Sequence, residues 1–227
     1  MQSNVLVFAK RSLNLSKILA GVGLGLAALG IFVIFALSLL AGSSSAAVFV
    51  LPVSFMSFGL LIFATPVTLL YVYDKNNGVL EYLLSLGWNQ SDIFKQYLKA
   101  ALFLALILFI GEGAAILIAG VIAGLMAVFA LDLLMVFLTA FMGFSVVSLV
   151  TVAMMAFSTL QKQRVGANTP LGMAIGVPFI FPTFYLSFLG FNPELIIYLS
   201  LCTVAAALSV ALLLLSSRLI RREKMLP

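Results

Sequence analysis

Long apolar runs separated by short polar segments are the feature that most constrains this sequence. A helix needs about 20 apolar residues to cross the roughly 30 Å hydrocarbon core of a bilayer, where backbone polar groups must be satisfied within the protein. Reading each run as one spanning helix predicts an all-α integral membrane protein, with residues 1–227 forming a single transmembrane domain. The six predicted transmembrane helices are 17–41, 48–73, 100–125, 133–160, 171–190 and 195–217.

The composition agrees with a membrane protein and excludes several functional classes. Of the 227 residues, 64 % are hydrophobic and 8 % are charged, too few charges for a soluble fold to cover its apolar surface. The net charge of +5 does not indicate a nucleic-acid partner, because the basic residues are not gathered on one solvated face. With no histidine and one cysteine, Cys202, the chain cannot build a disulfide framework, a histidine metal site or a Ser/His or Cys/His hydrolase. We expect no catalytic residue, cofactor or metal site.

The basic residues predict the orientation. All 12 Lys and Arg residues precede or begin the first span, lie between spans two and three or four and five, or follow the sixth. The opposite turns, AGSSSAA, AVFALDL and GFNPE, contain none. By the positive-inside rule both termini are therefore cytoplasmic. The first apolar run, 18–41, exceeds the roughly 7–15 residues of a signal-peptide core, so we expect it to remain as a span.

The amino-terminal stretch predicts an amphipathic helix. Within residues 3–16, Val5, Phe8, Ser12 and Leu15 share one helical face, and Arg11 lies elsewhere with the other charged side chains. This pattern is typical of a helix lying in the cytoplasmic membrane interface in contact with lipid. The alternative is a frayed tail.

The segment YDKNNGVLEYLLSLGWNQSDIFKQYLK, residues 73–99, is the longest polar stretch. Apolar positions recur at helical spacing and predict a short cytoplasmic helix that Gly87 ends. These positions are Val79, Leu80, Leu83 and Leu84. Asn89 or Ser91 then caps a second helix that runs into span three. A helix this short must pack against something, so it either lies on lipid headgroups or presents its leucines to a cytoplasmic partner.

This segment carries a family resemblance. Asp74, the run Gly78-Val79-Leu80-Glu81 and the run Leu83-Leu84-Ser85 resemble the acidic residue, G-[ST]-[LI]-E and [LM]-L pattern of permease subunits in type-two ATP-binding-cassette exporters. The layout of most of the chain is similar too, and its size resembles that of the haem-exporter permease subunits. In two places the chain departs from the family: Gly87 stands where proline is usual, and Gln96-Tyr97 replaces a Gly-Lys pair.

The resemblance implies that the short helix is the coupling helix of a permease, seated on an ATPase. The implied coupling residues are Gly78, Leu80, Glu81, Leu83, Leu84 and Ser85. The chain has no G-x-x-x-x-G-K-[ST] sequence, so ATP and Mg are expected in a separate cytoplasmic ATP-binding-cassette ATPase and this chain is not itself an enzyme. Six spans correspond to half of such a transporter. A second permease copy, identical or paralogous, is therefore implied, in a prokaryotic cytoplasmic membrane.

Some intramembrane residues are candidates for a transport pathway or gate. Glu112 is the one charged residue within predicted span three, and it serves either the pathway or a structural hydrogen bond. In span five, Pro178 and Pro182 predict a kink or a re-entrant piece, with Phe181 and Tyr185 beside them.

The function expected from these features is export of an unidentified amphipathic or hydrophobic solute, driven by a partner's ATP hydrolysis. A secondary transporter or channel that uses Glu112, or a non-transporting membrane scaffold, remains an alternative. Small-residue pairs at G-x-x-x-G spacing, among them Gly21 and Gly25, predict close helix packing within the subunit.

Overall fold

The computed structural model describes residues 5–41 and 47–122, together with 145, 147–156, 158, 200, 203, 204, 206–208, 210, 211, 214 and 215. These residues form helices and the turns between them, and no strand occurs among them, so the all-α class is confirmed for this part of the chain. The predicted fifth span, with Pro178, Phe181, Pro182 and Tyr185, lies outside the described residues.

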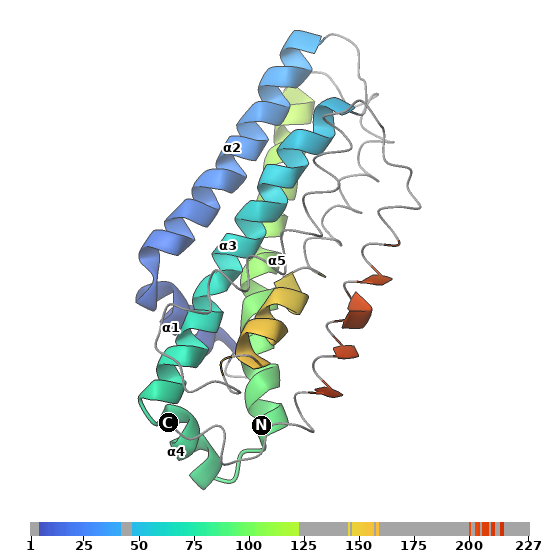
Figure 1. Ribbon diagram of the computed structural model, residues 1–227. Helices are drawn as coiled ribbons and strands as arrows, with labels where there is room; N and C mark the ends of the chain where they lie inside the picture. Colours follow the sequence, from blue (N-terminus) through green and yellow to red (C-terminus); the bar gives the residue numbers. More distant parts are fainter. Residues whose placement is uncertain are drawn as a thin grey trace.

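Five helices follow one another in the first half of the chain (Figure 1). They are α1 (Val5–Leu15), α2 (Lys17–Ala41), α3 (Ala47–Asn76), α4 (Val79–Ser85) and α5 (Gln90–Ile122). The bounds of α2 are those expected from the apolar run. The helix that begins after Asn89 continues without a break into the third apolar run, so α5 starts well before residue 100.

Two of the described helical stretches are long and apolar enough to cross a membrane, Phe58–Asn76 in α3 and Gln90–Ala114 in α5. A third is present if Val5–Leu15 and Lys17–Val33 are counted as one bent pair, in which the helices meet at 95°. At about 1.5 Å per residue, α5 is roughly 50 Å long and exceeds a bilayer core of about 30 Å. Part of a spanning α5 must therefore project beyond the hydrocarbon region.

Glycines bring α2 and α3 close together. The side of α2 that contacts α3 carries Gly23 and Ala27, and α3 places Gly59 against them. A Cβ atom on Gly23 would lie 2.7 Å from the backbone nitrogen of Phe63, so only glycine fits this approach. The expected packing by Gly21 and Gly25 is wrong for the described structure: both are exposed, and a Cβ on either would meet nothing within 4 Å.

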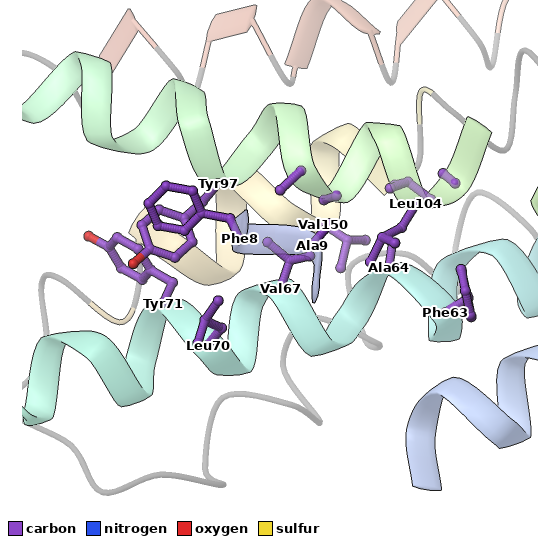
Figure 2. Close-up of a cluster of buried hydrophobic side chains, with 14 of the residues drawn as sticks. Phe8, Ala9, Phe63, Ala64, Val67, Leu70, Tyr71, Tyr97, Leu104 and Val150 are labelled. Atoms are coloured by element: carbon purple, nitrogen blue, oxygen red, sulfur yellow. The ribbon is translucent and has the colours of Figure 1, made fainter. Parts of the chain in front are cut away.

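The buried core lies between α3, α5 and α1, with Val150 contributing from a later helix (Figure 2). Small and branched side chains, including Ala64, Val67 and Leu104, fill the space along α3 and α5. Burying an aliphatic side chain of this size contributes about 1.5–3 kcal/mol in water, but in lipid the advantage comes mainly from close packing. The core therefore fixes α3 against α5 along the length of the described bundle.

The short helix α4 is bounded by two glycines with left-handed backbone conformations. Gly78, with φ 72°, turns the chain out of α3, and Gly87, with φ 84°, turns it toward α5. The Gly87 N–H donates to the Leu84 carbonyl at 3.1 Å, and the Trp88 N–H to the Leu83 carbonyl at 3.2 Å. This pair of bonds is the Schellman pattern that ends helices. The prediction that Gly87 ends this helix is confirmed.

Candidate functional site

A buried carboxylate joins three helices where α3 ends. Asp74 is 0 % exposed, and both of its oxygens accept a bond from another helix. Arg11 Nη2 of α1 donates to Oδ1 at 2.8 Å, and the hydroxyl of Tyr97 on α5 donates to Oδ2 at 2.6 Å. We call these three residues the Asp74 junction. A buried charge is stable only when it is paired and hydrogen-bonded, and both conditions are met here.

Aromatic rings surround the junction. The Phe8 ring of α1 lies 4.7 Å from that of Tyr97, and Tyr71 of α3 meets Tyr97 edge-on at 5.1 Å between centroids. Figure 2 shows Phe8, Tyr71 and Tyr97 gathered at one end of the buried cluster. The Tyr71 hydroxyl is buried and, in the described structure, has no hydrogen-bond partner. The two tyrosines thus share one environment but differ in whether the hydroxyl is bonded.

One face of the amphipathic helix α1 packs on the chain's own core. Phe8, Ala9 and Ser12 are buried against α3 and α5, while the outer side of α1 exposes Leu6 and Val7. Of the face expected from the sequence, Phe8 and Ser12 are buried, whereas Leu15 is 42 % exposed. The apolar side that the periodicity identified therefore packs mainly on protein.

Lys75, the residue after Asp74, makes a contact on another side of α3. Its Nζ donates to the carbonyl of Ser158 at 2.6 Å, although the two residues are 83 positions apart. Lys75 is 6 % exposed, and Ser158 follows the apolar helix Val147–Ala156. Burial lowers the number of waters that can solvate the ammonium group, so the carbonyl takes their place.

The expected coupling residues of α4 divide into an inner and an outer side. Leu80 is fully buried, and Leu83 and Leu84 are half-buried against the core. Glu81 and Ser85 are exposed, and the Ser85 hydroxyl donates to the Tyr82 carbonyl of the same helix at 2.7 Å. Leu80 therefore fixes α4 to the chain and offers no surface to a partner. The large apolar groups that α4 and its cap expose are Tyr82, at 63 %, and Leu86, at 58 %.

Glu112 is buried far along α5 from the junction. It is 2 % exposed, and its Oε1 has no hydrogen-bond partner in the described structure. Two buried threonines of α3 differ from it, because Thr65 and Thr68 donate to the carbonyls of Leu61 and Thr65 in their own helix. Glu112 is thus a buried ionisable group whose polar requirement the described contacts do not meet.

Sequence reasoning identified Asp74 only as part of a motif and missed its partners. Arg11 was assigned to the polar side of an interface helix, and Tyr97 appeared as a departure from the family's Gly-Lys pair. The usable signal was Asp74 itself, because an acidic residue at the end of an apolar helix requires a cation or donors once it is buried.

Comparisons of this chain with protein families, with curated proteins and with solved structures find no match. Among the described residues, no group of three or more His, Cys, Asp and Glu side chains is placed to hold a metal ion.

Proposed function

We propose that this chain is the permease subunit of an ATP-driven exporter in a prokaryotic cytoplasmic membrane. In this proposal it has six spans and two cytoplasmic termini, and moves an amphipathic or hydrophobic solute outward. α1 lies at the cytoplasmic interface, and α4 is the coupling helix on which a separate ATPase acts. A second permease copy, identical or paralogous, completes the pathway.

The observation that carries the proposal is the construction of α4. It is a two-turn helix held between glycine turns, anchored inward by Leu80 and exposing Tyr82 and Leu86 on its outer side. It directly joins the two best candidate membrane spans, α3 and α5. A force applied to its outer side would therefore be passed to both helices at once, as a transmission element requires.

The sequence motif adds independent support. The residues of the resemblance, from Asp74 to Ser85, coincide with the end of α3, the Gly78 turn and all of α4. The 95° bend between α1 and α2 suits an interface helix followed by a span. Arg11 joins α1 to the base of α3 through its bond to Asp74.

The first prediction concerns the source of energy. Because the sequence has no P-loop, the purified chain is expected to hydrolyse no ATP. When purified from its native membrane in mild detergent, it is expected to bring down a cytoplasmic ATPase of the ATP-binding-cassette class. Mass spectrometry and a phosphate-release assay measure both outcomes. Hydrolysis by this chain alone, or a native complex lacking any ATPase, contradicts the proposal.

The second prediction concerns Glu112, whose buried Oε1 has no hydrogen-bond partner among the described residues, an observation that also supports the alternative of an ion-coupled transporter. Glu112→Gln keeps the shape and removes the ionisable carboxyl group, so assembly should persist while transport into vesicles changes by about tenfold, the effect of roughly 1.4 kcal/mol. Thr68→Val is the matched control, because that buried hydroxyl is bonded within its own helix. Transport that depends on Glu112 and on a proton gradient, without ATP, would favour the alternative. Unchanged transport would assign Glu112 a structural role.

A further inference from the structure

Two consecutive residues at the end of α3 hold three other parts of the chain. Asp74 accepts bonds from Arg11 of α1 and from Tyr97 of α5. Lys75 donates to Ser158, beyond the Val147–Ala156 helix. Consecutive side chains on an α-helix point about 100° apart. Asp74 and Lys75, although adjacent in the sequence, therefore contact different parts of the chain. The bonded partners are 63, 23 and 83 residues distant along the sequence.

This pair lies directly before α4. The Gly78 N–H donates to the Lys75 carbonyl at 3.2 Å, and the Tyr82 N–H donates to the Gly78 carbonyl at 3.0 Å. Leu80 then packs fully buried in the same core. In Figure 1, α4 lies at the end of the bundle where α3 and α5 meet it. A displacement of α4 is therefore passed to the end of α3, where Asp74 and Lys75 are bonded to other parts of the chain.

We propose that Asp74 and Lys75 are positioning residues that couple α1, α5 and the Val147–Ala156 helix through the base of α3. When α4 moves, α1, α5 and the Val147–Ala156 helix move together. The role in transport rests on the proposed function, whereas the coupling is a property of this chain alone.

The physical basis is the cost of separating buried charges. Asp74 is 0 % exposed and Lys75 is 6 % exposed, so neither can exchange its protein partner for bulk water where it stands. Moving α1 away from α3 would leave the carboxylate without its cation. Moving Ser158 away would leave the ammonium group without that acceptor. Each neighbour therefore follows the base of α3, and loosening one contact relaxes the position of the others.

Amide hydrogen exchange on the purified chain in lipid nanodiscs tests the coupling without any ATPase. Lys75→Met removes the charge and retains most of the length. It is expected to raise exchange about fivefold or more, the lower end of typical coupling between sites, in Val147–Ala156 and also in α1. Arg11→Met loosens the contact on the other side of the pair. Because coupling is reciprocal, it is also expected to raise exchange both in α1 and in Val147–Ala156.

Matched controls separate this coupling from general loosening. Lys99→Met and Lys10→Met remove exposed charges beside the site. Neither should change exchange in Val147–Ala156, and Lys99→Met should not change it in α1. Exchange that rises only in the segment touching the altered residue overturns the proposal. So does an equal rise throughout all helices, which would show loss of the fold. If Lys75→Met or Arg11→Met fails to fold, Arg11→Met combined with Asp74→Asn decides the question, because this double variant removes both charges of the pair and leaves no buried carboxylate without its cation.

A second measurement uses the assembled transporter. Tyr97→Phe removes a hydroxyl that donates to Asp74, and Tyr71→Phe removes one with no described partner in the same aromatic cluster. Solute moved per ATP hydrolysed should fall about fivefold or more in Tyr97→Phe, with ATPase binding retained, and stay unchanged in Tyr71→Phe. If the two variants move the same amount of solute per ATP hydrolysed, the proposed role of the Asp74 contact in transport is overturned. If no ATPase binds the unaltered chain, the proposed function fails, and the exchange experiment still decides the coupling.

Discussion

Gly23→Ala should separate α2 from α3 and destabilise the chain. The added methyl group would lie 2.7 Å from the Phe63 nitrogen and 2.9 Å from its Cα, and neither backbone atom can rotate away. Overpacking of this kind costs typically 1–3 kcal/mol or more, against a gain of up to about 1 kcal/mol in helix propensity. We expect a net loss of about 1–2 kcal/mol. A lower unfolding midpoint in denaturant titrations of the detergent-solubilised chain measures it.

The same helix supplies the controls for this change. Gly21→Ala and Gly25→Ala have the same composition and propensity gain, but nothing lies within 4 Å of either new Cβ. Both should be neutral or slightly stabilising in this chain. Gly59→Ala, whose Cβ would meet the Gly23 carbonyl oxygen at 2.9 Å, should behave like Gly23→Ala. If Gly23→Ala and Gly21→Ala unfold at the same midpoint, the close approach of α2 to α3 is wrong.

These glycines show that the sequence pattern did not identify which face of α2 packs on α3. The G-x-x-x-G spacing drew attention to Gly21 and Gly25, yet the packing positions are Gly23 and Ala27, which have the same spacing with alanine as the second small residue. In a uniformly apolar helix, every face is equally compatible with lipid and with protein. Spacing alone therefore cannot select the face that α3 covers.

The helical elements were easier to predict than their contacts. The apolar run 17–41 gave the bounds of α2, and Gly87 correctly marked the end of α4, because length and cap chemistry are local properties. The Asp74 junction depends instead on Arg11, which is 63 residues away. A long-range pairing of this kind follows from tertiary packing, which no local pattern encodes.

The orientation of α4 shows the same limit. Leu80, Leu83 and Leu84 were expected to contact a partner because they form one apolar helical face. That face packs on the chain itself, most completely at Leu80. An apolar stripe indicates that a helix packs on something, but its occupant can equally be the same chain.

Leu86→Asp should release the proposed ATPase while leaving the membrane helices folded. In the proposed function the outer side of α4 docks on the ATPase, and Leu86 and Tyr82 are the apolar side chains exposed there. Truncating or charging an interface anchor typically costs 2 kcal/mol or more, about a thirtyfold loss of affinity. Because Leu86 is already 58 % exposed, the carboxylate is not buried within the chain itself. Leu83→Asp would be a poorer test, since Leu83 also packs against the core.

Asn89→Asp is the control for the added charge. It introduces the same carboxylate three residues further on, at an exposed position directly before α5, where aspartate caps a helix as well as asparagine. Titrating the isolated ATPase onto nanodisc-embedded chain, by light scattering or surface binding, should show weakened binding for Leu86→Asp alone. The unfolding midpoint should stay unchanged in both variants. Wild-type affinity in Leu86→Asp would mean that the outer side of α4 is not the docking surface. If both variants weaken ATPase binding equally, the effect is due to the added charge, and the proposal of an apolar contact at Leu86 is wrong.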